Sequence, residues 1–331
     1  MSFGGDALAE RLGARLGIVE EKLAGQVRLD DLQIDPATSH LAYAGGKRLR
    51  PALALLASEL GVHPDADAVY DSAIVVELTH LASLYHDDVM DEAPMRRGVP
   101  SAQAKFGNTV AILAGDILFA RASSIVAGLG PRAVLLHAKT FERLCQGQLH
   151  ETLGPRPGQS AREHYIQVLA DKTGSLVAAS AVHGVLSAGG TQETADVLAA
   201  YGECVGVAFQ LADDIIDIEV DGEITGKTPG TDLREGVDTM PIILLREQSA
   251  AGSLDAAGER ILRLLADADL ASDEALAAVV ALLREHPVLE QTRRMALQWA
   301  ARAEAHLEEV PDGEIRRALV DFSRQAVERV A

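Results

Sequence analysis

Apolar residues recur at three- and four-residue steps along almost the whole chain. Residues 66–91 are typical, since Ala73, Val76 and Leu84 fall on one side of a helix with polar residues between them. Short segments rich in Gly and Pro interrupt this pattern, and most of the stretches between them are long enough for several helical turns. The pattern therefore predicts a chain built almost entirely of α-helices.

The interruptions predict the loops between these helices. They fall at residues 44–46, 61–64, 94–100, 128–131, 154–158, 189–190, 221–236 and 249–258. The sequence has no alternating apolar and polar run of strand length, no internal repeat and no Pro/Ser-rich linker. We therefore expect one all-α domain spanning residues 1–331. The longest irregular stretch, 221–241, is of a length that is more often functional than idle.

Composition supports the helical prediction and limits the partners. The chain has 331 residues, of which 48% are hydrophobic and only 4% aromatic, and its formal net charge is −19. We therefore expect no binding to nucleic acid or to an anionic membrane surface. No apolar run reaches the roughly 18 residues that span a bilayer, so we expect no stable membrane insertion and a cytoplasmic protein. Cys145 and Cys204 lie in apolar helical patterns and are expected to be small buried thiols rather than a disulfide.

Two acidic clusters carry most of the functional information. The first consists of Asp87, Asp88 and Asp91, and the second of Asp213, Asp214 and Asp217. Each has the spacing D-D-x-x-D, which places three carboxylates on neighbouring parts of one helix face. Such carboxylates repel one another unless a cation neutralises them, and oxygen ligands suit Mg²⁺ that is shared with substrate phosphates. The alternative is a pair of solvated acidic patches, but two copies of one spacing arise by chance much more rarely than one.

Cationic residues close to these clusters in the sequence indicate a phosphate ligand. Gly46, Lys47 and Arg50 lie in the segment GGKRLRP at the start of an apolar helix. Backbone N–H groups can approach a phosphate there, and the helix N-terminus adds positive charge. The same segment could also be a basic helix start without a ligand. Arg96 and Arg97 follow the first cluster, where they could pair with its carboxylates or grip phosphate oxygens.

Several single residues extend the candidate site. His80 lies two helical turns before the first cluster on the same face, as either a core histidine or a phosphate donor. Lys172 and Thr173 place a cation and a hydroxyl inside a helical run, and Gln210 shares the helical stripe of the second cluster. Lys227, in the loop beyond, could fold over the site as a lid. Together these residues predict two facing acidic helices with metal between them and cations for more than one diphosphate, without a nucleophile–base pair.

The order and spacing of these motifs resemble the trans-polyprenyl diphosphate synthases over nearly the whole chain. The matching segments are GGKRLRP (45–51), HLASLYHDDVMDEAPMRRG (80–98), GNTVAILAGD (107–116), KT (172–173), FQLADDIID (209–217) and GKTPGTDL (226–233). The resemblance implies an all-α, isoprenoid-synthase-type helical bundle around a deep central cavity, with the two Asp-rich helices facing each other at its mouth. It also implies a homodimer that adds isopentenyl diphosphate head-to-tail to an allylic diphosphate.

The resemblance implies a role for each candidate residue. The metal ligands, for three Mg²⁺ at each active site, would be Asp87, Asp88, Asp91, Asp213, Asp214 and Asp217. The allylic diphosphate would also be bound by Arg96, Lys172, Thr173, Gln210 and Lys227. Isopentenyl diphosphate would be bound by Gly46, Lys47, Arg50, His80 and Arg97. The catalytic set, which stabilises charge on the departing diphosphate, would be Asp87, Asp88, Asp91, Asp213, Lys172 and Lys227.

Small residues before the first cluster predict a long product. Ala82 and Ser83 lie one helical turn before it and Thr79 lies one turn deeper, where short-chain members of the family tend to carry an aromatic ring. A growing tail gains about 0.8 kcal/mol per buried CH₂, so we expect elongation to about C30 to C50, as for a quinone side chain. The alternative is that these residues only permit close helix packing. A floor residue on another helix, near Leu135 to Phe141, would end the tunnel.

Other functions fit parts of this pattern. A medium-chain geranylgeranyl or farnesyl diphosphate synthase would share the motifs, whereas a non-catalytic subunit of a heteromeric synthase would tend to have eroded acidic clusters. A terpene cyclase would normally lack the site at Lys47 and Arg50. A Mg²⁺-dependent nucleotide pyrophosphatase would have no role for Arg96 and Arg97. The intact motifs therefore favour a polyprenyl diphosphate synthase.

Overall fold

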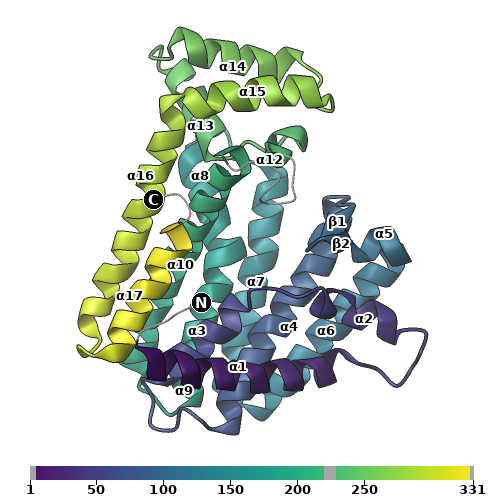
Figure 1. The fold of residues 1–331 in the computed structure, drawn as a ribbon, viewed down its shortest axis with the longest axis vertical. Coiled ribbons are helices and arrows are strands. Elements are labelled where there is room, and N and C mark those ends of the chain that lie inside the picture. The colour runs from purple at the N-terminus through teal and green to yellow at the C-terminus, as the bar shows by residue number, and fades with distance from the viewer. Residues whose placement is uncertain (1–4, 220–228, 329–331) are drawn as a thin grey trace. The chain divides into compact units, whose positions relative to one another are not determined.

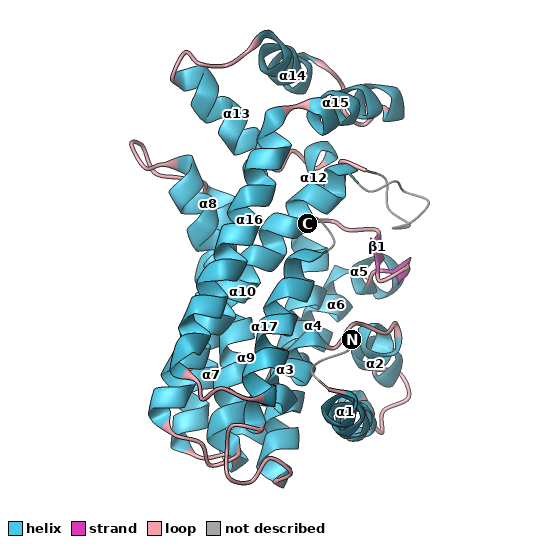
Figure 2. Cartoon of the chain, turned by 60° about the vertical axis from the view of Figure 1, so that its left-hand side comes forward, coloured by secondary structure: helices cyan, strands magenta, loops and turns pink. Residues whose placement is uncertain are grey.

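The structure is a computed structural model that describes residues 5–219 and 229–328. Within these ranges it consists of helices joined by short loops, and its strands form a single two-stranded hairpin (Figures 1 and 2). The all-α prediction is confirmed. The chain divides into two compact units, which are described separately below. The single domain expected for residues 1–331 stays a prediction.

Unit 1 comprises residues 1–144, 175–203 and 306–321. Its elements are α1 (Asp6–Val27), α2 (Asp35–Tyr43), α3 (Leu49–Ser58), α4 (Asp67–Met90), β1 (Met95–Arg96), β2 (Val99–Pro100), α5 (Ala102–Phe106), α6 (Asn108–Gly128), α9 (Ser175–Ser187) and η2 (Leu307–Glu309). Unit 2 comprises residues 145–174, 204–305 and 322–331. It contains α8 (Ala161–Leu169), η1 (Ala170–Gly174), α12 (Thr231–Arg234), α13 (Met240–Ala250), α14 (Ala256–Asp267), α15 (Asp273–Glu285) and nearly all of α16 (Pro287–His306). Both units include parts of α7 (Pro131–Leu153), α10 (Gln192–Glu219) and α17 (Glu314–Val327).

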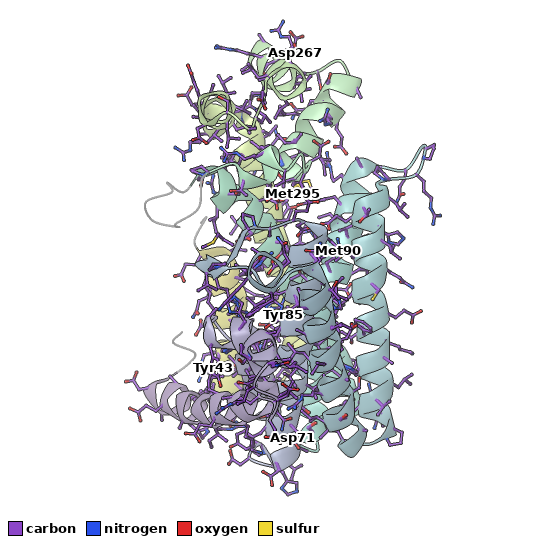
Figure 3. All side chains as sticks on the ribbon, turned by 90° about the vertical axis from the view of Figure 1, so that its right-hand side faces the viewer. Tyr43, Asp71, Tyr85, Met90, Asp267 and Met295 are labelled. Atoms are coloured by element: carbon purple, nitrogen blue, oxygen red, sulfur yellow. The ribbon has the colours of Figure 1, made fainter. Side chains whose placement is uncertain are left out.

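Helix α4 is the centre of unit 1 and packs against α3, α6 and α9. Its middle is apolar on every side and is buried accordingly, as at Ile74, Leu78 and Leu81. Tyr85, further along, is fully buried, and its hydroxyl donates to the carbonyl of Ala37, which ties α2 to α4. Figure 3 marks Tyr85 and then Met90, where α4 ends. This packing fixes the helix end that carries the first acidic cluster.

A small hairpin follows α4 and was not predicted, because its two strands have only two residues each. β1 and β2 pair antiparallel, with Arg97 and Gly98 as the two turn residues. Both have positive φ, 54° and 77°, as a two-residue turn that matches the strand twist requires. The hairpin therefore sets the directions of the two neighbouring arginines.

The core of unit 2 is formed by α10, α13, α15 and α16. Leu211 and Ile215 of α10 lie in one apolar cluster with Ile242 of α13 and Leu283 of α15. The helical run at 161–187 contains a π-helical segment, η1, at Ala170–Gly174. Such segments occur frequently at functional sites, and this one contains two of the candidate residues.

One expectation is corrected. Cys145 is exposed and only Cys204 is buried, because Cys145 lies on the same uncovered face of α7 as Leu149; neither cysteine forms a disulfide. Helices α6 and α10 are long and apolar enough to cross a membrane by length and composition, although their charged residues had broken the apolar runs in the sequence. The 18-residue apolar window is 61% buried in α10 but only 33% buried in α6. An apolar face of α6 is therefore left uncovered by the described chain.

Candidate active site

The three carboxylates of the first cluster have different surroundings at the end of α4. Asp88 is fully buried, and its Oδ1 accepts a hydrogen bond from Arg96 Nε at 2.6 Å. Its Oδ2 is buried without a hydrogen-bond partner. Burial raises the pKa of Asp88, and the positive charge of Arg96 opposes that rise. Asp87 is half-buried and Asp91 is exposed.

This donor set fits a divalent cation that completes its coordination with substrate. Asp87 and Asp91 offer carboxylate oxygens one helical turn apart, which are hard ligands of the type that Mg²⁺ prefers. Within residues 5–219 and 229–328, no group of three or more His, Cys, Asp or Glu side chains is placed to hold a metal ion by itself. Mg²⁺ at phosphate sites commonly uses one or two protein carboxylates and takes its other ligands from water and phosphate.

A cluster of cationic groups lies in the same unit. Arg97 donates through Nη1 to the carbonyl of Leu41 at 3.0 Å and to the carbonyl of Gly45. A Cβ at Gly46 would lie 3.0 Å from the Arg97 Cζ, so glycine lets the loop and the guanidinium approach each other. Burial and the nearby charge of Arg97 lower the pKa of Arg50 to about 10, although the charge of Glu77 opposes this fall.

His80 belongs to this cationic cluster. Burial lowers the pKa of His80 well below its ordinary value, and Arg50 and Arg97 add to the effect. A neutral imidazole beside two guanidiniums can still donate one N–H to an anion. Lys47 is exposed in the loop that precedes α3. The structure thus brings Gly46, Arg50, His80 and Arg97 together, with Lys47 in the adjoining loop, and their role as a binding site stays a prediction.

The second cluster, on α10, is also divided between buried and accessible carboxylates. Asp214 is 5% exposed and accepts hydrogen bonds from the Tyr165 hydroxyl at 3.0 Å and from the Met240 N–H at 3.2 Å. Burial raises the pKa of Asp214 well above its usual range. Asp217 accepts from the N–H groups of residues 231 and 232, at 3.2 and 3.3 Å, and so holds the start of α12. Asp213 is exposed.

Lys172 and Thr173 lie in the π-helical segment η1 of unit 2. The Lys172 ammonium forms an ion pair with Glu151 of α7. A Cβ at Gly147 would lie 2.9 Å from the backbone nitrogen of Lys172, so this glycine allows α7 and η1 to pack closely. Gln210 is half-buried on α10. Lys227, the predicted lid residue, lies outside the described residues.

The candidate residues are divided between the two units. The first cluster and the cationic cluster lie in unit 1, whereas the second cluster, Lys172, Thr173 and Gln210 lie in unit 2. The expectation that the two Asp-bearing helices face each other across a cavity stays a prediction.

The proposed tunnel residues all lie on α4. Thr79 and Ala82 are fully buried, and Ser83 is half-buried with its hydroxyl donating to the carbonyl of His80 at 2.9 Å. A Cβ at Gly115 of α6 would lie 3.2 Å from the Ala82 carbonyl oxygen. Close packing of α4 against α6 therefore accounts for part of this small-residue pattern, and the tunnel stays a prediction.

Sequence reasoning missed several acidic and phenolic partners of the site. Glu77 is 2% exposed and pairs with Arg48, and Glu20 of α1 pairs with the same guanidinium. A single carboxylate inside the apolar run of α4 was a usable signal for Glu77. Tyr165 and Glu151 lie far in sequence from the residues they contact, and nothing in their local pattern marks them.

Comparison with known proteins identifies the family. Residues 32–282 match the polyprenyl synthetase family. The chain belongs to this family. Nonaprenyl diphosphate synthase of Mycobacterium tuberculosis is 43% identical over 326 residues, which cover 98% of this chain and 96% of that protein. The chain is accordingly a polyprenyl diphosphate synthase, a trans-prenyltransferase.

Solved structures of the same fold support this assignment. The geranylgeranyl pyrophosphate synthase of Corynebacterium glutamicum, complexed with calcium and isoprenyl diphosphate, has a TM-score of 0.87 and 39% identity, covering 100% of this chain and 99% of that one. The polyprenyl synthase of Caulobacter crescentus, complexed with the same two ligands, has a TM-score of 0.88 and 30% identity with the same coverage. The isoprenoid-synthase-type all-α fold expected from the motifs is confirmed.

Proposed function

We propose that this synthase elongates an allylic diphosphate with isopentenyl diphosphate to a long-chain product, and that its two acidic clusters act on one allylic diphosphate. The observation that carries the proposal is the arrangement in unit 1. There a half-buried cationic cluster and the metal-compatible end of α4 lie within one compact unit. A reaction that joins two diphosphate substrates needs two such neighbouring sites.

Isopentenyl diphosphate would bind at the cationic cluster. Arg50, Arg97 and His80 are half-buried, and Arg97 is also held by hydrogen bonds to two backbone carbonyls, so few of their rotamers must be fixed on binding. Lys47 and the backbone of Gly46 would complete this site. The neutral imidazole would donate a hydrogen bond, and the guanidiniums would neutralise the phosphate charge.

The allylic diphosphate would bind between the two acidic clusters. Asp87 and Asp91, together with Asp213, offer the oxygens that would hold Mg²⁺, which lowers the barrier to diphosphate departure by neutralising its charge. For Asp88 and Asp214 we propose a positioning role instead of direct ligation, since both are buried. Oδ1 of Asp88 accepts a hydrogen bond from Arg96, and Asp214 accepts from Tyr165 and Met240.

The chain's own cations would stabilise the departing diphosphate. Arg96 and Lys172 would bind its oxygens, with Thr173, Gln210 and Lys227 completing the contacts. The allylic carbon, now carrying positive charge, would be attacked by the double bond of isopentenyl diphosphate in a site from which water is excluded. The released diphosphate would accept the proton lost in forming the new double bond.

A long product, of about C30 to C50, follows if the tail passes Thr79, Ala82 and Ser83, because each buried CH₂ gains about 0.8 kcal/mol. The 43% identity to a nonaprenyl diphosphate synthase supports this length, although a geranylgeranyl pyrophosphate synthase is 39% identical. Ala82→Phe and Ser83→Tyr should shorten the product, as measured by chromatography of the dephosphorylated alcohols. Unchanged product lengths in both variants would exclude this path for the tail.

We further propose that a second copy of the chain covers the exposed face of α6 and α7. Ile112 and Leu113 of α6 and Leu135 of α7 are 41%, 55% and 56% exposed. Opposite this face, small residues of α6 pack on α4, so α6 is not a helix surrounded by lipid. Light scattering should give twice the chain mass of 35.0 kDa, and Leu113→Asp should reduce it to that of one chain. A monomeric unmodified chain would contradict this part of the proposal.

The activity is tested by incubating the purified chain with Mg²⁺, labelled isopentenyl diphosphate and an allylic primer. We expect labelled long-chain polyprenols after dephosphorylation, and none when Mg²⁺ is chelated. Absence of product from this chain alone would indicate a subunit of a heteromeric synthase, and a cyclised hydrocarbon would indicate a cyclase. A cytoplasmic location, as expected from the sequence, is part of the proposal.

A further inference from the structure

We propose that helix α1 is a positioning element for the isopentenyl diphosphate site, acting through Glu20, Arg48 and Glu77. The inference rests on the proposed function, because it concerns how that site is held in shape. None of these three residues is assigned to substrate. They act on the loop that carries Lys47 and on the first turn of α3, which carries Arg50.

Arg48 is buried and uses all three of its nitrogens in hydrogen bonds to protein groups, so we do not assign it to phosphate binding. It is 7% exposed, and its Nε and Nη2 donate to the two carboxylate oxygens of Glu20 at 2.7 and 3.3 Å. Its Nη1 donates to Glu77 at 2.8 Å, and its Nη2 donates also to the carbonyl of Ala42 at 3.0 Å. A two-pronged contact of this type fixes both the position and the plane of a guanidinium.

The backbone at Arg48 explains why such a contact is needed. Arg48 has φ of 49° and ψ of 36°, a left-handed conformation that is unfavourable for a residue with a side chain. It is the N-cap of α3 and follows Lys47, which is preceded by Gly45 and Gly46, two glycines with positive φ. The ion pairs to Glu20 and Glu77 hold this strained residue in place. Because Lys47 precedes it and Arg50 lies in the first turn of the helix after it, fixing Arg48 fixes the directions of both.

Glu77 links Arg48 to the rest of the cationic cluster. It is 2% exposed on α4, three residues before His80. Its charge also acts on Arg50 and Arg97, since it opposes the burial-induced fall in the pKa of each. With Glu20 sharing the charge of Arg48, the cluster keeps net positive charge toward a diphosphate. Glu20, at 45% side-chain exposure, is the part of the network that can be changed with the least cost to folding.

The alternative is that these ion pairs only attach α1 to the rest of unit 1. The chain offers a matched control, because a second ion-pair set attaches the same helix to the other end of α3. Arg11 and Arg15 of α1 contact Glu59, the residue after α3, at 2.8 and 2.6 Å. Glu59 lies ten residues beyond the loop that carries Lys47 and Arg48. Loss of this second set should loosen α1 without disturbing the loop.

The test compares Glu20→Gln with Glu59→Gln by steady-state kinetics with each substrate varied in turn. Glu20→Gln should raise the KM for isopentenyl diphosphate roughly tenfold or more, because small misplacements of a binding group are costly. It should leave the KM for the allylic diphosphate within about twofold, and Glu77→Gln should produce the same pattern. Glu59→Gln should lower the melting temperature yet leave both KM values unchanged.

Provided that the unmodified enzyme makes polyprenyl product, any one of three results with the variants would overturn the inference. They are an unchanged KM for isopentenyl diphosphate in Glu20→Gln, an equal rise in both KM values, and the same selective rise in Glu59→Gln. If Glu77→Gln does not fold, Glu20→Gln alone decides the question. Failure of the unmodified chain to turn over would instead contradict the proposed function, so the two failures are distinguished.

Discussion

Arg96 donates a hydrogen bond through Nε to the buried Oδ1 of Asp88 at 2.6 Å. The two residues flank the end of α4, and the hairpin that follows the helix turns Arg96 back onto it. The middle carboxylate of the first acidic cluster therefore orients a guanidinium, while Asp87 and Asp91 lie nearer to solvent. Carboxylates that look equivalent in the sequence D-D-x-x-D have different surroundings in the fold.

This difference predicts that Asp87 and Asp88 respond differently to the same substitution. Asp87→Asn should raise the Mg²⁺ concentration for half-maximal activity by roughly tenfold or more, since it removes a charged ligand. Asp88→Asn should lower kcat/KM for the allylic diphosphate by roughly 10- to 100-fold, the range expected when a charge-assisted hydrogen bond is lost. Its Mg²⁺ requirement should be unchanged. Mg²⁺ titrations of both variants make the comparison, and equal shifts would make Asp88 a metal ligand.

Gly46 and Gly45 form a second matched pair. Both have positive φ, so alanine is strained at either position, but only a Cβ at Gly46 meets the guanidiniums of Arg97 and Arg48, at 3.0 and 3.1 Å. Gly46→Ala should therefore raise the KM for isopentenyl diphosphate well above the value for Gly45→Ala. Melting temperatures of the two variants, measured alongside, should fall by similar amounts. A larger KM effect at Gly45 would contradict the contact that we describe.

Tyr165 should stabilise unit 2 through Asp214. Tyr165→Phe removes the phenolic donor to a carboxylate that is only 5% exposed and leaves the Met240 N–H, so it should lower the free energy of unfolding by about 2 kcal/mol. In an Asp214→Asn background, Tyr165→Phe should lower the free energy of unfolding by less, because no buried carboxylate then loses a hydrogen-bond donor. Urea denaturation of the unmodified chain, the two single variants and the double variant measures both changes. Equal costs in the two backgrounds would show that Tyr165 acts by packing alone.

His183 should make stability depend on pH in a defined range. Burial lowers the pKa of His183 from 6.5 to about 4, with a further effect from His137, so the folded chain resists its protonation. Above pH 6.5 the group has no effect. Between about pH 6.5 and 4 the unfolded chain binds the extra proton, and the free energy of unfolding should fall by up to about 3 kcal/mol as pH decreases. Below the pKa of His183 in the folded chain, this group causes no further fall in the free energy of unfolding.

The comparison with His183→Gln isolates this contribution from that of the carboxylates. Unfolding curves of both chains should converge as pH falls from 6.5 to 4, because only the chain with histidine loses stability through this group. Parallel curves over that range would mean that His183 is protonated in the folded chain without cost.

Much of the fold was predictable because the apolar pattern of this chain is regular. The helix expected at residues 66–91 is α4, at Asp67–Met90, and the Gly/Pro breaks at 128–131 and 189–190 are loops. The hairpin at 95–100 and the π-helical segment at 170–174 were missed, because each is too short to have a period of its own. Burial of Cys145 was predicted wrongly, because periodicity does not reveal which helix face is left uncovered.

The candidate site was predictable to the level of residue clusters. Charge and spacing pointed to Arg50, His80 and Arg97, and the structure brings them together. The partners that orient such groups, Glu20 for Arg48 and Tyr165 for Asp214, come from distant segments. Tertiary packing creates these contacts, and a single sequence contains no local pattern for them.

The central claim is that the two acidic clusters share one diphosphate. The most direct test is a crystal structure of the chain with Mn²⁺ and an unreactive allylic diphosphate analogue, in which anomalous scattering locates the metal ions. The account predicts Mn²⁺ ions that bridge Asp87 and Asp213 to oxygens of the same diphosphate. Mn²⁺ held by one cluster alone, with the diphosphate beyond the reach of the other, would contradict it.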